Sequence, residues 1–203
     1  MGHNGGRLRD VAGAVLLGGS STRMGCDKAS LTVGGVATAT RVARVLTELF
    51  EDVLLVGGDP PADAPGRRVP DPPGPPCPLR GIVAALGAAE AERVLIVATD
   101  LPLVTPGLLL GILAWPRAEV VVPRPGGVAQ PLCALYRREV AKRAASARLQ
   151  TDRLAAKGLL AELQASYLED ADLAELDPDG VALANLNRPE DLAHAETLIA
   201  RAR

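Results

Sequence analysis

Short apolar runs alternate with amphipathic stretches along most of the chain. Four of these runs have the length and side chains of buried strands: Val11–Val15, Asp52–Gly57, Arg93–Ala98 and Glu119–Pro123. Gln130–Tyr136 is a fifth candidate strand. Continuous apolar character without polar alternation is typical of strands that are buried on both faces of a sheet.

Between these runs, apolar residues recur at helical spacing. Thr38–Phe50 carries them on one face, with Thr38 as the expected N-cap. Gly81–Glu90 repeats the pattern, and Thr105 followed by Pro106 is typical of a helix start. The chain after the fifth candidate strand is mostly helical in character.

This alternation predicts an α/β fold, a three-layer α/β/α sandwich with a mostly parallel, Rossmann-like sheet. We expect the proline-rich connection Asp59–Pro78 to be a long functional loop, because strand and helix patterns resume directly after it. Residues 1–9 are polar and rich in glycine, and we expect a flexible tail there. Residues 10–203 then form a single domain.

The composition excludes several classes of function. The formal charge is −2 with both signs interspersed, which is not the basic footprint of nucleic-acid binding. No apolar run approaches the ~20 residues that cross a bilayer, and the N-terminus lacks the apolar core of a signal peptide. Cys26, Cys77 and Cys133 are too far apart for a metal knuckle, and we expect three reduced thiols. These features predict a cytoplasmic protein without nucleic acid or membrane as a partner.

The segment Leu16–Lys28 carries the most informative chemistry. It follows the first predicted strand and contains Gly18 and Gly19, and it also holds the cations Arg23 and Lys28. Small residues let backbone N–H groups approach an anion, which the cations neutralise. The spacing is neither that of a Walker A loop nor that of the dinucleotide fingerprint. The loop therefore predicts a local site for nucleotide phosphates, with attack at the α-phosphate and pyrophosphate as the leaving group.

Asp100 follows the apolar strand Arg93–Ala98, where a carboxylate has no packing role. A carboxylate there requires a counter-charge, and Mg²⁺ takes few carboxylates together with phosphates and water. The alternative is an aspartate that caps the loop leading to Thr105. Because ligands of such sheets bind at the carboxyl ends of strands, we expect Asp100 and the Gly18–Gly19 loop to face one cleft.

Five segments, in order along nearly the whole chain, resemble motifs of the MobA-like molybdenum cofactor guanylyltransferases, within the wider Rossmann-like nucleotidyltransferases. They are Leu16–Lys28, Asp71–Gly81, Thr99–Pro102, Gln130–Tyr136 and Asn185–Leu192. The first is similar to the family's L-A-G-G-x-S-x-R-M-G-x-D-K loop, and the third to its metal-binding D-x-P. The resemblance implies a nucleotide-diphospho-sugar transferase-like fold. It also implies transfer of GMP from GTP to the molybdopterin cofactor, with Mg²⁺ as the metal.

The resemblance further implies roles on the nucleotide side. Nucleotide contacts are implied for Leu16, Leu17, Gly18, Gly19, Lys28, Gly57, Asp71 and Asp100. The implied catalytic residues are Lys28, Arg23 and Asp100. Lys28 would stabilise charge on the leaving pyrophosphate, and Asp100 would hold Mg²⁺.

On the acceptor side, the resemblance implies contacts from Arg153, Asn185 and Asn187. Asn187 together with Glu190 also fits a capping pair for the last predicted helix, and both roles stay open.

The chain departs from the family pattern at several positions, and these departures leave alternatives open. Leu17, Cys77 and Arg80 replace smaller residues, and Gly57 and Gly58 stand where guanine-specific relatives often have asparagine. The alternatives are cytidylyl transfer to the same cofactor, guanylyl transfer to a cobamide precursor or a sugar phosphate, and a non-catalytic carrier of the cofactor. Transient contacts with cofactor-delivery proteins or apo-molybdoenzymes are compatible with the main expectation.

Overall fold

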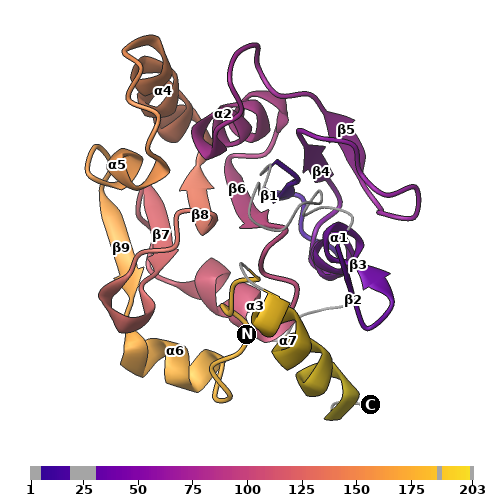
Figure 1. The fold of residues 1–203 in the computed structure, drawn as a ribbon. Coiled ribbons are helices and arrows are strands. Elements are labelled where there is room, and N and C mark those ends of the chain that lie inside the picture. The colour runs from indigo at the N-terminus through magenta and orange to yellow at the C-terminus, as the bar shows by residue number, and fades with distance from the viewer. Residues whose placement is uncertain (1–5, 19–30, 187–188, 202–203) are drawn as a thin grey trace.

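The computed structural model describes residues 6–18, 31–186 and 189–201. Within these residues, the centre is a seven-stranded sheet in the order β5-β4-β1-β6-β8-β7-β9 (Figure 1). Its strands are β1 (Val11–Leu16), β4 (Val53–Val56), β5 (Arg67–Val69), β6 (Arg93–Ala98), β7 (Val120–Pro123), β8 (Cys133–Arg137) and β9 (Ala165–Leu168). Two further strands, β2 (Thr32–Val33) and β3 (Val36–Ala37), form a separate antiparallel pair.

Most neighbouring strands of the sheet are parallel. β1 is parallel to β4 and β6, β4 to β5, and β7 to β9. β8 is antiparallel to both of its neighbours, β6 and β7. Leu16 lies opposite Val56 on one side and Ala98 on the other. The carboxyl ends of β1, β4 and β6 therefore lie level with one another.

Helices cover both faces of the sheet. They are α1 (Thr38–Leu49), α2 (Pro78–Ala88), α3 (Pro106–Ala114), α4 (Arg138–Gln150), α5 (Ala156–Leu160), α6 (Asp170–Leu176) and α7 (Pro189–Arg201). α1, α3 and α6 share one apolar cluster, and α2, α4 and α5 share the other. Figure 1 shows α2 beside α4, away from α1 and α3. The α/β/α sandwich predicted from the sequence is therefore confirmed.

Strand β1 contributes to both clusters because its side chains alternate. Val11 and Val15 belong to the cluster that contains α1, and Ala12 and Ala14 to the cluster that contains α2. No helix in the described part of the chain has the length and apolar character needed to cross a membrane.

Helix α1 begins differently from the sequence prediction. Thr38 is its first residue, and Ala37 occupies the N-cap position without a capping side chain. The N–H of Thr38 donates instead to the carbonyl of Leu31, at 2.8 Å. Because β3 runs directly into α1, a backbone partner replaces the cap.

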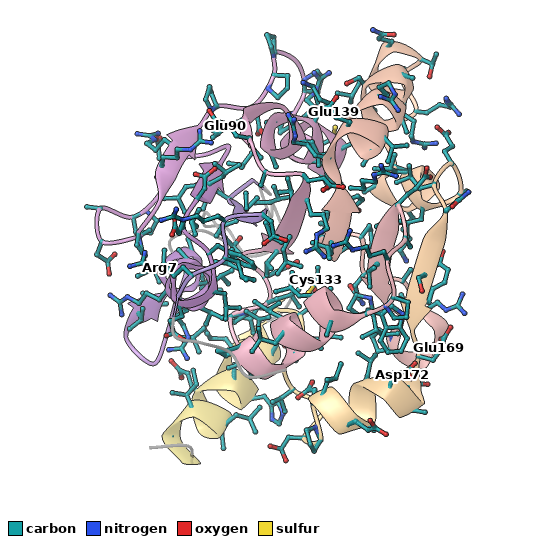
Figure 2. All side chains as sticks on the ribbon, turned by 180° about the vertical axis from the view of Figure 1, so that it is seen from behind. Arg7, Glu90, Cys133, Glu139, Glu169 and Asp172 are labelled. Carbon is teal, nitrogen blue, oxygen red and sulfur yellow. The ribbon has the colours of Figure 1, made fainter. Side chains whose placement is uncertain are left out.

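Two short strands also correct the sequence prediction. The connection Asp59–Pro78 contains β5, which adds a parallel strand at the edge beside β4. β9 lies in the region expected to be mostly helical and pairs with β7. It leads into α6, where the N–H of Glu169 donates to Asp172 Oδ2 at 2.9 Å. Figure 2 shows these two residues side by side.

Two residues of the expected N-terminal tail, Leu8 and Arg9, contact the domain. Leu8 forms a parallel bridge with Phe50, and Arg9 pairs with Glu51 at 2.7 Å. Among the described residues, Leu8 and Arg9 therefore contact the domain, although the sequence assigns them to the tail.

Candidate active site

A cavity of about 300 Å³ lies at the carboxyl ends of β1, β4 and β6. Leu16 at the end of β1 and Gly18 just after it line the cavity, as do Thr99 and Asp100, which directly follow β6. The connection before α2 supplies further lining residues, among them Asp71 and Cys77. The cavity is mainly apolar in its lining but includes the carboxylates Asp71 and Asp100. The structure thus places Gly18 and Asp100 on one cleft.

Glycines from three elements surround the carboxylate of Asp71. A Cβ atom at Gly57 would lie 2.6 Å from Asp71 Oδ2, and one at Gly18 would lie 3.7 Å from the same oxygen. A Cβ at Gly81 would lie 3.8 Å from Oδ1. Gly57 also has a φ of +76°, which other L residues rarely adopt. Only the Cβ at Gly57 would crowd the carboxylate, because the distances at Gly18 and Gly81 are ordinary van der Waals contacts, so the missing side chain at Gly57 is what makes room for Asp71.

The environment of Asp71 is unfavourable for its charged form. Oδ1 is buried and has no hydrogen-bond partner. Burial raises the pKa of Asp71, and the nearby charge of Arg80 lowers it by a smaller amount. Donors supplied by a ligand would relieve this cost, because buried polar groups are normally paired. Asp71 is therefore a candidate for contacting N–H groups of a bound molecule.

Arg80 holds the proline-rich wall of the cavity. Its Nε donates to the carbonyl of Pro75 at 2.9 Å, and its Nη1 donates to the carbonyl of Pro73. Gly74, with a φ of +125°, lies against the guanidinium group, where a Cβ would overlap it. The arginine that departs from the family pattern thus fixes the loop that precedes Cys77.

Asp100 lies on the border of a second cavity, of about 450 Å³. Gln130, Lys157 and Asn185 line this cavity as well. The carbonyl of Asp100 accepts a hydrogen bond from the N–H of Leu186 at 2.8 Å, which brings Asn185 to this edge of the sheet. A molecule in either cavity would therefore meet the same aspartate.

The thiols near this site differ in exposure. Cys77 is half-buried and Cys133 is fully buried, and both are free cysteines. Cys133 lies in the interior of the molecule (Figure 2), where burial and the charge of Asp100 raise its pKa to about 12. Cys26 lies outside the described residues.

Several other residues singled out in the sequence lie away from the first cavity. The side chain of Leu17 is buried in the core with α1, so its bulk does not narrow the cavity. Gly57 lies against the carboxylate of Asp71 and does not itself line the first cavity. Arg153 Nη1 pairs with Glu162 at 2.7 Å, and Arg153 does not line the second cavity. Gly19, Arg23, Lys28 and Asn187 lie outside the described residues.

Two features of the site were not anticipated from the sequence. One is the set of glycines around Asp71; a signal was present, since Gly57 is the last residue of the predicted strand Asp52–Gly57. The other is Lys157, which lies in a stretch without periodic or motif character.

The residues at the shared border suit a particular metal ion. Asp100 offers a carboxylate, a hard oxygen ligand, at the border shared by the two cavities. Mg²⁺ is usually bound through one or two carboxylates, with phosphate oxygens and water as its other ligands. The donor chemistry of Asp100 therefore fits Mg²⁺.

Comparison with known proteins identifies the family. Residues 13–167 match the family model described as "MobA-like NTP transferase domain". The chain belongs to this family. Membership in the MobA-like NTP transferases makes the protein a nucleotidyltransferase, as the sequence motifs predicted.

Relatives of this MobA-like protein cover nearly its whole length. It is 35% identical over 202 residues to the probable molybdenum cofactor guanylyltransferase of Pelotomaculum thermopropionicum, an alignment that covers 97% of each chain. A crystal structure of molybdopterin-guanine dinucleotide biosynthesis protein A from Archaeoglobus fulgidus superposes with a TM-score of 0.80 at 20% identity, covering 94% of this chain and 99% of that one.

The fold is shared with enzymes of other specificity. The 2-C-methyl-D-erythritol 4-phosphate cytidylyltransferase of Thermus thermophilus has a TM-score of 0.71 at 18% identity, covering 92% of this chain and 98% of its own. At such low identity the likeness shows the fold alone. The choice of nucleotide must therefore be argued from residues of the site.

Proposed function

We propose that the protein transfers GMP from GTP to the phosphate of a molybdopterin-type cofactor and releases pyrophosphate. Curated relatives across nearly the whole chain carry this activity in their names. The single observation in the structure that favours it is the Asp71 carboxylate in the first cavity, with Oδ1 buried and without a partner.

The chemistry of Asp71 favours guanine over cytosine. The Watson–Crick edge of guanine presents N1–H and N2–H donors side by side, which match the two oxygens of a carboxylate. Cytosine presents one amino group, N4, next to the acceptor N3, so the second oxygen of Asp71 would face an acceptor. A carboxylate whose Oδ1 has no partner of its own therefore favours GTP over CTP.

The two cavities suggest how the substrates are arranged. Guanine bound at Asp71 occupies the first cavity, and the triphosphate extends toward Asp100. The acceptor occupies the second cavity, whose border also includes Asp100. This arrangement brings the acceptor phosphate next to the α-phosphate, and positioning of this kind is a large part of catalysis in phosphoryl transfer.

The reaction requires no strong general base. An oxygen of the acceptor phosphate, already an anion at neutral pH, attacks the α-phosphorus. The bond from this phosphorus to the bridging oxygen of the β-phosphate breaks, and pyrophosphate leaves with the electron pair. Asp100 would hold Mg²⁺, which neutralises charge on the phosphates when it is bound.

Lys28 and Arg23 are proposed as the cations that meet the triphosphate, on the basis of the family motif. They lie outside the described residues, but both ends of their segment are described. The segment leaves β1 at Gly18, which lines the first cavity. It returns at Leu31, which packs in a small cluster with Leu186, the residue bonded to the Asp100 carbonyl. Gly18 and Leu31, the two described ends of the segment, therefore lie on the same side of the sheet as Asp100.

The test is a matrix of nucleotides and acceptors. Each of the four nucleoside triphosphates is incubated with Mg²⁺ and with molybdopterin, a cobamide precursor or a sugar phosphate, and pyrophosphate and product mass are measured. The proposal predicts the guanine dinucleotide product from GTP and molybdopterin. Preference for CTP would indicate a cytidylyltransferase, and another acceptor would change the substrate class. Tight binding of the cofactor without pyrophosphate release from any nucleotide would indicate a carrier.

A cytoplasmic site of action is also part of the proposal. The free thiols Cys77 and Cys133 fit a reducing compartment.

A further inference from the structure

The acceptor cavity contains a cation that the sequence motifs do not identify. Lys157, the second residue of α5, lines the cavity of about 450 Å³ together with Asp100 and Asn185. Lys157 takes part in none of the ion pairs among the described residues. Its ammonium group is therefore available to an anion that enters this cavity.

Arg153, the arginine expected at the acceptor, is committed elsewhere. Its Nη1 pairs with Glu162 Oε1 at 2.7 Å, and its Nε donates to Thr151 Oγ1 at 3.0 Å. Neither Arg153 nor Glu162 lines the acceptor cavity. The structure thus separates the nearby arginine from the cavity and places a lysine there.

The segment that carries Lys157 is held by a buried arginine of α4. Arg148 is 7% exposed. Its Nη2 donates to the carbonyl of Ala155 at 3.2 Å, and its Nη1 donates to the carbonyl of Gly158 at 3.1 Å. These two carbonyls flank Lys157 in the chain. A Cβ at Gly158 would overlap the guanidinium group, so the contact depends on a glycine there.

Glu162 completes this support. Its Oε1 accepts a hydrogen bond from Arg148 Nη1 at 2.7 Å, and it is the same oxygen that pairs with Arg153. A guanidinium group paired with a carboxylate and bonded to two carbonyls has a fixed orientation. α5 is only five residues long, so its position depends on such tertiary contacts more than on its own helical stability.

The remaining lining of the cavity indicates what kind of molecule the lysine meets. Val128 is 49% exposed and lines the cavity beside Ala129 and Leu132. An apolar surface of this kind fits the carbon framework of an organic ligand. A lysine ammonium binds phosphate as a compact charge. The cavity therefore suits a phosphorylated organic molecule with an apolar face.

We propose that Lys157 binds the phosphate of the acceptor, and that Arg148 is a positioning residue that holds Lys157 at the cavity through the carbonyls of Ala155 and Gly158. This inference rests on the proposed function, because it assigns a residue to that reaction's acceptor. The acceptor phosphate must approach the α-phosphate and Asp100, which are negatively charged. A cation on the acceptor side offsets this repulsion.

Steady-state kinetics with one substrate varied at a time test the role of Lys157. Lys157→Ala is expected to raise KM for the acceptor about tenfold or more, because one hydrogen bond to a charged group is lost. KM for GTP is expected to stay within about twofold of the wild-type value. Lys157→Arg, which keeps the charge, is expected to recover most of the loss. Lys142→Ala, on α4 and outside the lining of both cavities, is the matched control and is expected to behave as wild type.

A double-mutant cycle tests the role of Arg148. Arg148→Lys is expected to raise the acceptor KM, whereas adding Arg148→Lys to Lys157→Ala is expected to raise it little further. A merely structural role would give additive effects and would also alter KM for GTP. If Arg148→Lys does not fold, Glu162→Gln is the second variant, since it weakens the same support while Arg148 keeps both carbonyls. Additive effects of either variant with Lys157→Ala overturn the positioning role.

Calorimetric titration of the acceptor into wild type and Lys157→Ala separates this inference from the proposed function. Equal acceptor affinity of the two proteins, or a loss confined to Arg153→Ala, overturns the inference even where GTP turnover is normal. Absence of wild-type turnover with GTP and molybdopterin overturns the proposed function, whereas weaker binding of molybdopterin by Lys157→Ala would still support the role of the lysine.

Discussion

Gly57 makes room for the carboxylate of Asp71. A Cβ at Gly57 would lie 2.6 Å from Asp71 Oδ2, closer than real Cβ atoms come to other atoms, and 3.1 Å from Cγ, which is a tight contact. Gly57 directly follows β4 and Asp71 follows the parallel neighbour β5, and the φ of +76° at Gly57 turns the chain there. The space left by the missing side chain at Gly57 is thus taken by an acid.

Gly57→Ala is expected to displace Asp71 and to weaken GTP binding by at least about tenfold, through loss of hydrogen bonds to a charged group. The left-handed backbone adds a stability cost of about 1–2 kcal/mol. The matched control is Gly35→Ala, because Gly35 has a φ of +77° and a Cβ there would meet nothing within 4 Å. The control is expected to lose similar stability and to bind GTP normally. Equal GTP affinities for the two variants, measured by calorimetry, would refute the role of Gly57.

Asp71→Asn is expected to stabilise the ligand-free protein while weakening GTP binding. The gain should be on the order of 1 kcal/mol at neutral pH, because a buried charge without partners for Oδ1 is removed. Thermal unfolding followed by circular dichroism measures it. Asp59→Asn is the control, since Asp59 is 91% exposed and belongs to the same connection. A lower unfolding temperature for Asp71→Asn than for wild type would contradict this account.

The stability difference should depend on pH in a defined direction. Burial raises the pKa of Asp71 above its ordinary value of 3.8, so the folded protein retains the proton at pH values where the unfolded chain has lost it. The free energy of unfolding of wild type therefore falls as pH rises from 3.8 through the raised pKa. Asp71→Asn lacks this contribution, and its advantage should grow across the same window. GTP affinity of wild type should rise there, since guanine donors bind the ionised carboxylate.

Cys77 should report occupancy of the first cavity. It lines the cavity and is half-buried, whereas Cys133 is fully buried. Treatment with N-ethylmaleimide is expected to modify Cys77, abolish GTP binding by filling the cavity, and leave Cys133 unmodified. Peptide mass spectrometry identifies the modified residue. Bound GTP should slow the modification about tenfold or more at saturating concentrations. Unchanged labelling of Cys77 in the presence of GTP would place the nucleotide elsewhere.

Asp100→Asn is expected to lower kcat about 100-fold or more, the loss typical of removing a group that stabilises charge in the transition state. Chelation of Mg²⁺ from wild type should cause a comparable loss, and chelation should add little to the variant. Asp179→Asn is the control, because Asp179 lines a different cavity, beside α1 and α7. Activity of Asp100→Asn within a few-fold of wild type at saturating Mg²⁺ would remove the aspartate from the proposed metal site.

The central strands were predictable because their residues leave little choice. β6 spans the predicted Arg93–Ala98, and β1 extends one residue beyond the predicted Val11–Val15. Short, continuous apolar runs of this kind are typical of strands that are buried on both faces of a sheet. The start of α3 was equally clear: Thr105 Oγ1 accepts the N–H of Leu108 at 3.2 Å, and Pro106 follows.

The edge strand β5 was not predictable from the sequence because it has no apolar run of its own. β5 contains Arg67 and Arg68 and forms because β4 offers it a hydrogen-bonding edge.

The residues of the site also differ in how far the sequence predicts them. The position of Asp100 at the first cavity could be foreseen because it comes just after a buried strand, whereas that of Asp71 was indicated by the family resemblance. The position of Lys157 could not be foreseen, because tertiary contacts from Arg148 decide where it lies.

The central claim is that the cavity at Asp71 selects a guanine nucleotide, and titration calorimetry with GTP and CTP tests it most directly. Wild type is expected to bind GTP at least about tenfold more tightly than CTP, and Asp71→Asn is expected to lose most of that preference. Equal affinities for the two nucleotides in wild type, or tighter binding of CTP, would contradict the account.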